Sequence, residues 1–265
     1  MLDTITKIAR EAGAEILTYY GRELTVETKA DDSPLTQADR ASHRLICERL
    51  REFDPSIPVL SEESPDGEIR ERKNWKRFWL VDPLDGTKEF IKRTGEFTVN
   101  IALIEDGVPV LGVIYVPARE STYFADKGKG AWKREAGCKP EGIRVRQPDE
   151  ARLAIVASRD HAGPQVKELL RRFPQAEAKS MGSSLKFCLV AEGEADLYLR
   201  DVPTMEWDVG AAQCIVEAAG GVVLTLDKRP LRYNKDDLRN PALLTAGDPG
   251  FAVEALGRLS RSSPS

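Results

Sequence analysis

Two carboxylates stand close together in one short motif, where an apolar run leads into Asp82-Pro83-Leu84-Asp85-Gly86-Thr87. Pro83 lacks the N–H that strand pairing needs, so we expect Asp82 to end a strand and the residues after it to open a helix. Both carboxylates and the Thr87 hydroxyl would then meet at one tip. Clustered carboxylates and a backbone carbonyl, such as that of Leu84, are ligands that Mg²⁺ prefers. A capped strand-to-helix turn uses the same residue types, so the motif alone leaves both interpretations open.

Three further acids follow patterns that could place them beside this tip. Glu62 comes after a short apolar run, Asp39 stands at the start of an expected helix, and Asp208 begins another helix after Trp207. Each acid has a structural alternative: a solvated loop charge for Glu62, a helix N-terminal acid for Asp39 and a helix N-cap for Asp208. The chain has two histidines and four widely spaced cysteines without a CxxC pair, so we expect any metal to be held by oxygen.

Four segments together resemble the signatures of the inositol monophosphatase superfamily. In chain order they are Pro34–Asp39, Leu60–Ser64, Asp82–Phe90 and Trp207–Ala212. The resemblance implies an α/β fold (α+β overall), a layered αβαβα sandwich with an N-terminal antiparallel sheet and a C-terminal mixed sheet. It also implies a magnesium-dependent phosphomonoesterase, although a fold by itself does not fix the substrate.

The resemblance also implies a set of metal ligands. Glu62, Asp82 and the Leu84 carbonyl would hold one Mg²⁺. Asp82, Asp85 and Asp208 would hold a second, so Asp82 would bridge the two ions. Two such metals can activate water and clamp the attacking and leaving oxygens of phosphoryl transfer, so no phosphoenzyme is required.

A water-activating pair is implied on the same basis. Thr87, paired with Asp39, would orient and help deprotonate the attacking water, because a threonine hydroxyl alone is too weak a base at neutral pH. Glu63 would support the side of a third ion, so two or three Mg²⁺ ions are expected. The resemblance further implies inhibition by lithium.

Residues outside the metal core indicate the substrate class. Lys88 and Glu89 stand where inositol monophosphatases usually have Thr and Asn. The segment Gly182–Gly193 resembles the bacterial bisphosphate nucleotidases of the superfamily, which are tied to sulfur assimilation. This branch implies hydrolysis of the 3′-phosphate of 3′-phosphoadenosine 5′-phosphate to AMP and phosphate.

The 5′-phosphate of such a substrate needs a seat of its own, which we expect where Gly182-Ser183-Ser184 opens a helix. The hydroxyl of Ser183 and free backbone N–H groups would bind it beside Lys186, and Arg200 would add a second positive contact. A helix N-cap with a solvated lysine is the alternative. The other residues expected to contact substrate are Gly86, Thr87 and Asp208.

Several segments near this seat stay open. Ser158–His161 could contact the substrate or form a plain loop, so the roles of Arg159 and His161 are undecided. Phe187, Leu189 and Val190 are expected in the core rather than against adenine. Asp201–Glu206 departs from the Phe-Gly-Pro-Thr version associated with these nucleotidases, and the charged segment 67–77 does not align.

Two other functions compete with this one. The first is an inositol monophosphatase, which needs room for a cyclitol and no 5′-phosphate seat. The second, from another class, is a catalytically silent nucleotide-binding protein that kept the fold. The absence of GxxxxGK[ST] disfavours a Walker-type kinase or ATPase, and the absence of GxSxG disfavours a serine hydrolase.

The elements that must position these residues are indicated by periodicity. Apolar residues at helical spacing predict a helix from Leu2 to Tyr20, stopped by Gly21, and a second helix over 38–53. Thr36 and Asp39 resemble a capping box at the start of the second helix. The polar stretch between the helices, Thr28 to Pro34, reads as a turn or loop.

Strand patterns differ between the two halves of the chain. Phe78–Val81 predicts one strand, and 98–104 and 108–116 predict a hairpin closed by Glu105-Asp106-Gly107. In the second half, strands predicted at 154–157, 195–199, 222–226 and 243–246 alternate with helical stretches. The Gly-, Pro- and charge-rich stretch 134–149 marks the expected boundary, which gives an N-terminal domain 1–140 and a C-terminal domain 141–265.

Composition agrees with a folded enzyme acting on small molecules. With 41% hydrophobic and 31% charged residues a packed core is expected, and a net charge of −4 disfavours a nucleic-acid polymer as partner. No stretch has the roughly 18 apolar residues of a membrane span. We therefore expect a cytoplasmic protein, with peripheral association at the inner membrane and a homodimer as further options. The cysteines are expected to be buried free thiols.

Overall fold

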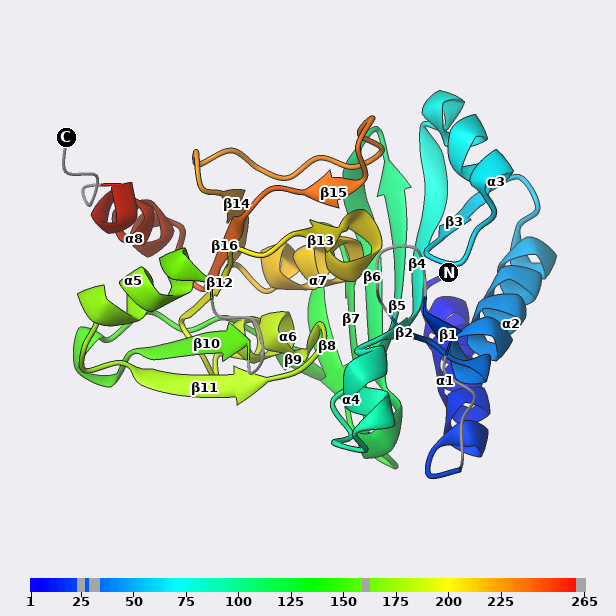
Figure 1. Ribbon diagram of the computed structural model, residues 1–265, viewed down its shortest axis with the longest axis horizontal. Helices are drawn as coiled ribbons and strands as arrows, with labels where there is room; N and C mark the ends of the chain where they lie inside the picture. The colour runs from blue at the N-terminus through cyan, green and yellow to red at the C-terminus, as the bar shows by residue number, and fades with distance from the viewer. Residues whose placement is uncertain (23–26, 29–33, 159–162, 261–265) are drawn as a thin grey trace.

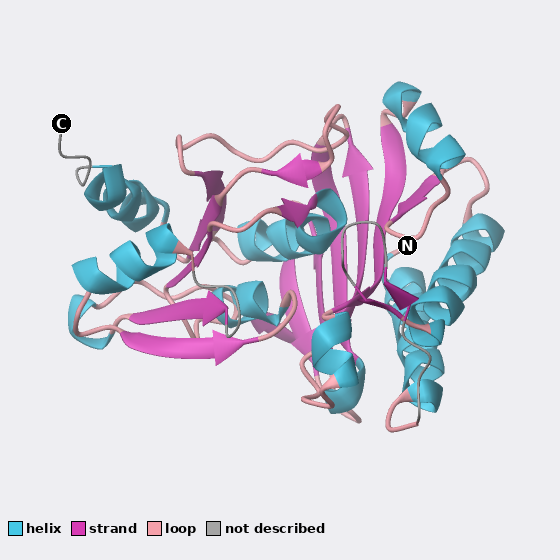
Figure 2. Ribbon diagram, in the orientation of Figure 1, coloured by secondary structure: helices cyan, strands magenta, loops and turns pink. Residues whose placement is uncertain are grey.

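The computed structural model describes residues 1–22, 27–28, 34–158 and 163–260. Most of the predicted loop 28–34 therefore lies outside the described residues, and so do Arg159 and His161. The described elements stack in five layers across the long axis, in which helical layers alternate with the two large sheets (Figures 1 and 2). This is the αβαβα arrangement that the sequence resemblance implies.

The first layer consists of α1 (Leu2–Tyr19) and α2 (Gln37–Phe53). Both were predicted within a residue or two, because their apolar stripes face the first sheet and their polar faces remain in water. Thr36 is the N-cap of α2, and its backbone N–H donates to Asp39 at 2.8 Å. The predicted capping box is thus confirmed. The pair β1 (Glu27–Thr28) and β2 (Pro34–Leu35) precedes α2.

The second layer is a seven-stranded sheet in sequence order. Its strands are β3 (Val59–Ser61), β4 (Arg77–Asp85), β5 (Thr98–Glu105), β6 (Val108–Val116), β7 (Ser121–Asp126), β8 (Gly130–Arg134) and β9 (Glu141–Ile143). The β5–β6 hairpin was predicted, and its turn places both Asp106 and Gly107 at positive φ. The expected antiparallel sheet needs one correction, because β3 runs parallel to β4. Strands β7 to β9 were not predicted.

The third layer contains α6 (Leu185–Ala191) and α7 (Glu206–Ala218), which lie between the two sheets. Helix α7 is buried on nearly every face, as expected for a helix covered on both sides. It packs closely on β6, since a Cβ added at Gly112 would lie 2.4 Å from the Ala211 carbonyl oxygen. One hydrophobic cluster includes residues of both sheets and both helices.

The fourth and fifth layers complete the C-terminal half. The mixed sheet has the order β11-β10-β12-β16-β14, with parallel pairing at β10 and antiparallel pairing at β16. Its strands are β10 (Ala154–Ser158), β11 (Glu177–Met181), β12 (Leu197–Arg200), β14 (Val222–Thr225) and β16 (Leu243–Ala246). Helices α5 (Pro164–Arg172) and α8 (Pro249–Ser260) cover its outer face. The expected mixed sheet is confirmed, with β11 as an unpredicted edge strand.

Smaller elements lie around this frame. They are α3 (Asp66–Glu71), α4 (Thr87–Ile91), the strand pair β13 (Thr204–Met205) and β15 (Arg239–Asn240), and the 3₁₀ turns η1 (Arg72–Asn74), η2 (Pro117–Arg119) and η3 (Glu150–Arg152). The first sheet ends at Ile143 and the second begins at Ala154, so the proposed boundary region overlaps the connection between them.

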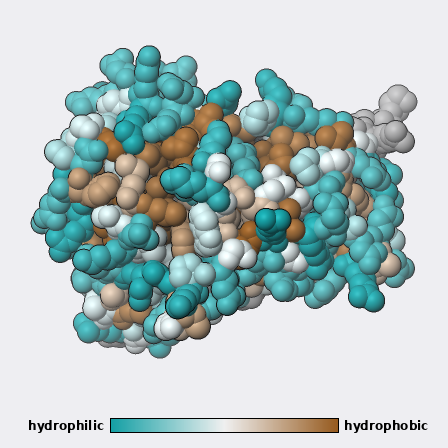
Figure 3. All heavy atoms as spheres, turned by 180° about the vertical axis from the view of Figure 1, so that it is seen from behind, coloured by the Kyte–Doolittle hydropathy of each residue, from teal (hydrophilic) through white to brown (hydrophobic). Residues whose placement is uncertain are grey.

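The molecular surface is largely hydrophilic. Figure 3 shows hydrophobic side chains gathered mainly over the N-terminal half of the rear face. Among the described large hydrophobic residues, the exposed ones are Met1, Ile91 and Val253, so most of this surface belongs to partly covered core residues. None of the helices in the described ranges has the length and apolar character of a membrane span. All four cysteines are free, but Cys138 is exposed, contrary to the expectation of buried thiols.

Candidate active site

The end of β4 presents the first two carboxylates, although not as the sequence predicted. The strand does not end at Asp82: its pairing with β5 lapses across Pro83 and Leu84 and resumes where Asp85 pairs with Thr98. Pro83 is tolerated because it lies in this bulge, where no ladder hydrogen bond is required. Its carbonyl accepts from Ser42 Oγ of α2 at 2.7 Å. The bulge leaves both Asp82 and Asp85 at the end of the strand.

A glycine turns the chain from β4 into α4. Gly86 has φ of 90° and is the N-cap of α4, so the helix begins at Thr87 as expected. The Thr87 hydroxyl lies 3.1 Å from Asp39 Oδ1 and 3.3 Å from the Leu84 carbonyl oxygen. The structure therefore brings together the predicted pair Asp39 and Thr87, which are 48 residues apart in sequence and lie on different helices.

Asp85 is held by α6 from the central layer. Asp85 Oδ2 accepts from both the backbone N–H and the Oγ of Ser184, each at 2.6 Å. Asn100 Nδ2 on β5 donates to Ser184 Oγ at 2.9 Å. Ser184, which was not predicted as a site residue, thus joins the first sheet to α6. Nothing in the local sequence signals this bond, since Ser184 precedes a helix as an ordinary N-cap residue.

Asp208 reaches the site from the first turn of α7. It is not the N-cap considered as its structural alternative: Met205 is the N-cap, and Asp208 is the third helical residue. Its Oδ2 accepts from the Met205 backbone N–H at 2.8 Å, and its carbonyl oxygen lies 2.8 Å from Ser184 Oγ. Asp208 therefore accepts a capping hydrogen bond at the start of α7 and also faces the end of β4.

The electrostatics show that these carboxylates share one region. Burial raises the pKa of Asp82 well above its ordinary value, and the nearby charges of Glu62, Asp85 and Asp208 raise it further. Burial, followed by Asp85 and Glu62, likewise raises the pKa of Asp208. The Glu62 backbone N–H donates to the Val81 carbonyl at 3.0 Å, which places Glu62 beside the end of β4.

This donor set fits hard divalent cations. Its ligands are oxygens, and Asp82 is 1% exposed among like charges, so cations would relieve a strong electrostatic penalty. Within the described ranges, no three His, Cys, Asp or Glu side chains are already arranged to hold a metal ion. One oxygen of Asp82 accepts from the Leu84 backbone N–H at 3.0 Å, and one oxygen of Asp208 accepts from the Met205 backbone N–H at 2.8 Å.

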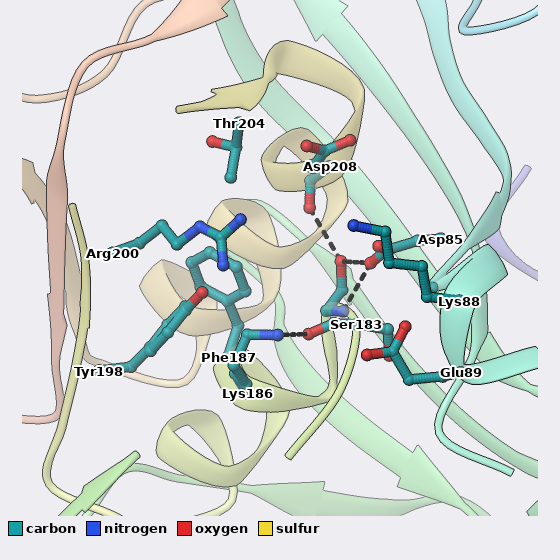
Figure 4. Close-up of a pocket in the computed structure, with 12 residues that line it drawn as sticks. Asp85, Lys88, Glu89, Ser183, Lys186, Phe187, Tyr198, Arg200, Thr204 and Asp208 are labelled. Atoms are coloured by element: carbon teal, nitrogen blue, oxygen red, sulfur yellow. Dashed lines mark hydrogen bonds between the residues drawn. The ribbon is translucent and has the colours of Figure 1, made fainter. Parts of the chain in front are cut away.

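A pocket joins the acids to two cations on its opposite side (Figure 4). Asp85 and Asp208 lie at one side, and Lys186 and Arg200 at the other. The remaining lining residues are Gly86, Lys88, Glu89, Ser183, Ser184, Phe187, Tyr198 and Thr204. Lys88, Tyr198 and Thr204 were not predicted as site residues. Lys88 extends from α4 toward the carboxylates. The one feature of the sequence that pointed to Lys88 was that it stands where inositol monophosphatases usually have Thr.

Lys186 is an unusual member of this pocket because it is nearly fully buried. Its Nζ donates to the Ser183 carbonyl at 2.7 Å and lies 5.7 Å from the centre of the Tyr198 ring. Burial lowers its pKa to about 8. Because Lys186 is buried, the solvated-lysine alternative is wrong. The second cation of the pocket, Arg200, donates through Nε to the Val202 carbonyl at 3.0 Å.

The backbone before α6 differs from the expectation of free N–H groups. The Gly182 N–H donates to Glu96 Oε2 at 2.8 Å, and the Ser184 N–H donates to Asp85. Helix α6 begins at Leu185, whose N–H lies 3.4 Å from Ser183 Oγ. Phe187 is buried as predicted, packs edge-on against Tyr198, and also lines the pocket.

The five-layer fold with acids gathered beside the central helices is that of a known family: residues 1–257 match the inositol monophosphatase family, and the chain belongs to it. Its similar relatives include the 3′(2′),5′-bisphosphate nucleotidase CysQ of Escherichia coli K12, 49% identical over 245 residues, covering 91% of this chain and 97% of that protein. The CysQ of Haemophilus influenzae is 35% identical, covering 95% and 94%.

Solved structures agree with these relatives. The crystal structure of CysQ from Bacteroides thetaiotaomicron is 42% identical and superposes with a TM-score of 0.81, covering 93% of this chain and 97% of that one. An IMPase from Thermotoga maritima superposes with a TM-score of 0.79 at 25% identity, covering 98% and 96%. The fold is therefore shared across the family, while sequence similarity is greater to the CysQ proteins.

Proposed function

We propose that this protein is a Mg²⁺-dependent phosphomonoesterase that hydrolyses the 3′-phosphate of 3′-phosphoadenosine 5′-phosphate, giving AMP and phosphate. The observation that carries the proposal is the pocket with carboxylates at one side and the cations of Lys186 and Arg200 at the other. A substrate with two separated phosphates matches both sides. The names of the similar CysQ proteins support the same chemistry.

The carboxylate side is proposed to hold two or three Mg²⁺ ions. Glu62, Asp82 and the Leu84 carbonyl would hold one, and Asp82, Asp85 and Asp208 a second, with Glu63 near a third. When bound, Mg²⁺ supplies positive charge that neutralises the phosphoryl group and favours ionisation of water.

Water activation is assigned to Asp39 and Thr87. Asp39 is 2% exposed and its Oδ1 lies 3.1 Å from Thr87 Oγ, so an ionised Asp39 would accept the Thr87 hydroxyl and leave the oxygen of Thr87 free to accept from a water. As the attacking water loses its proton to Thr87, Thr87 would pass its own proton to Asp39. The carboxylate is thus the base, and the hydroxyl carries the proton.

The cationic side is proposed to bind the 5′-phosphate. Ser183, Lys186 and Arg200 would contact its oxygens, and Gly86 the sugar-phosphate near the scissile bond. The Lys186 ammonium has been withdrawn from water by burial, so its interaction with a phosphate is weakly screened. A cyclitol monophosphate leaves this side unused, which distinguishes the alternative inositol monophosphatase function.

The proposal is tested by comparing turnover of 3′-phosphoadenosine 5′-phosphate and inositol 1-phosphate with and without Mg²⁺. We expect the bisphosphate to be preferred and the activity to require Mg²⁺. The Asp82→Asn and Thr87→Ala variants should fold but lose most activity, whereas Glu254→Gln on the outer helix α8 should match the wild type. Preference for inositol 1-phosphate would support the alternative, and ligand binding without phosphate release would indicate a silent nucleotide-binding protein.

A further inference from the structure

Asp201 lies in the segment that departs from the family pattern, directly after strand β12. Its side chain caps the start of another element, helix α5. Its Oδ2 accepts from the backbone N–H groups of Gln165 at 2.8 Å and Val166 at 3.2 Å, and its Oδ1 accepts from Gly163 at 3.2 Å. These donors lie at the start of α5, whose N-cap Gly163 has no side chain to serve them. Asp201 therefore provides the cap that α5 lacks.

The same residue is one position from a pocket cation. Arg200 ends β12 and lines the pocket, and its Nε donates to the carbonyl of Val202, which is the residue after Asp201. The turn that follows β12 is thus fixed at two points, by Asp201 on α5 and by Arg200 on Val202. An unbroken series of contacts links the start of α5 to the guanidinium in the pocket.

The charge of Asp201 would otherwise be unfavourable so near a phosphate seat. Its carboxylate accepts three N–H groups at the positive end of a helix dipole, which compensates the negative charge. Asp201 is also not among the residues that line the pocket. Its contacts therefore favour a supporting role over a direct one.

We propose that Asp201 is a positioning residue: by anchoring the turn after β12 to α5, it holds Arg200 in place to bind the phosphate remote from the scissile bond. This inference rests on the proposed function. Asp201 should consequently determine affinity for a bisphosphate, with little effect on the chemical step at the carboxylate side of the pocket.

Gly163 offers an independent way to test the same contact. Its φ is −74°, which any residue can adopt, but an added Cβ would lie 2.3 Å from Asp201 Oδ2. Gly163→Ala should thus displace the carboxylate while leaving its charge present. Asp201→Ala and Gly163→Ala should have the same effect, although they alter different residues.

The experiment compares Asp201→Ala, Gly163→Ala and Asp248→Ala with the wild type. Asp248 is the matched control, because its Oδ1 accepts from the Phe251 N–H at 2.7 Å at the start of α8, away from the pocket. Steady-state kinetics on 3′-phosphoadenosine 5′-phosphate and on adenosine 3′-phosphate would separate KM from kcat. Calorimetry would measure AMP binding directly.

We expect Asp201→Ala and Gly163→Ala to raise the bisphosphate KM and the AMP Kd by about fivefold or more, as partial loss of a charge-assisted contact predicts. Their kcat, and their KM for adenosine 3′-phosphate, should stay within about twofold of the wild type on the same reasoning. Asp248→Ala should change neither constant. Three outcomes would each overturn the inference. Asp201→Ala and Gly163→Ala could raise the KM of both substrates equally, or change the constants no more than Asp248→Ala does. Asp201→Ala could instead bind AMP more tightly, because it removes a negative charge. Wild-type turnover of the two substrates decides the proposed function separately.

Discussion

Replacing Asp39 with Asn removes one negative charge from the proposed water-activating pair while keeping its shape. Asp39 Oδ2 accepts from both the backbone N–H and the hydroxyl of Thr36, so the amide oxygen of Asn is expected to remain there. The amide nitrogen would then replace Oδ1 and donate to Thr87 Oγ. The Thr87 proton would turn toward the Leu84 carbonyl, which already lies 3.3 Å away. Thr87 could no longer pass a proton to residue 39.

The expected loss follows from the size of general-base catalysis. Such a base contributes a factor of about 10²–10⁴ to the rate, so kcat should fall by that factor. This loss corresponds to an activation free energy higher by about 2.7–5.4 kcal/mol. The stability loss should be only about 0.3–1 kcal/mol, because the N-cap hydrogen bond of α2 survives and mainly the charge at the helix start is lost. Magnesium-dependent phosphate release and thermal unfolding would measure the two effects.

Thr87→Ser is the matched control, since it keeps the hydroxyl and should retain most of the activity. Thr87→Ala should lose about as much as Asp39→Asn, and the double variant should lose little more, because the two residues act as one unit. An Asp39→Asn protein with more than half the wild-type kcat would refute the reasoning. Additive losses in the double variant would show that the residues act separately.

Three further predictions concern the charge and packing around the site. Burial and the neighbouring acids raise the pKa of Asp82, so its ionisation destabilises the metal-free fold as pH rises above the ordinary carboxylate pKa. Near neutral pH, metal-free Asp82→Asn should therefore have a higher Tm than the wild type, by about 2–4 °C for each kcal/mol gained in unfolding free energy. In calorimetry, added Mg²⁺ should raise the Tm of the wild type more than that of the variant. Burial lowers the pKa of Lys186 to about 8, so the bisphosphate KM should rise as pH increases through this value, and the dependence should disappear in Lys186→Gln. Gly112→Ala should cost about 1–3 kcal/mol of unfolding free energy because its Cβ meets the Ala211 carbonyl, whereas Gly142→Ala, with open space around it, should cost much less in chemical denaturation.

Elements with strong local patterns could be predicted from the sequence. Helices α1 and α2 have apolar stripes of 3.6-residue period, and the β5–β6 hairpin has an Asp-Gly turn between two apolar runs. Strands β9 and β11 were missed because their sequences, EGI and EAKSM, have no apolar run. They exist because β8 and β10 offer free edges for pairing, and this information lies elsewhere in the chain. The continuation of β4 past Pro83 likewise depends on its partner β5.

The candidate site divides in the same way. The acids and Thr87 occur in recognisable motifs, and the resemblance to the family implied the Asp39–Thr87 pair, whose oxygens lie 3.1 Å apart in the structure. Tyr198 could not be placed from the sequence, because it stands in an ordinary buried strand, and the departure at Lys88 indicated a substrate class without showing that its side chain lines the pocket. The hydrogen bonds that balance the negative charge of Asp201 could not be predicted either, because their donors are backbone N–H groups at the start of α5, about 36 residues earlier in the chain.

The contacts of Ser184 indicate how the five-layer fold and the site depend on each other. Ser184 accepts from Asn100 on β5 and donates to Asp85 at the end of β4, and the Asp208 carbonyl on α7 lies 2.8 Å from its hydroxyl. Because a hydroxyl has a single proton, it bonds to either Asp85 or Asp208 at a given moment. The Ser184 N–H holds Asp85 in both cases, so one carboxylate oxygen stays fixed whichever way the hydroxyl turns. The proposed metal ligands Asp85 of the first sheet and Asp208 of α7 are therefore held in register only when α6 is packed between the two sheets.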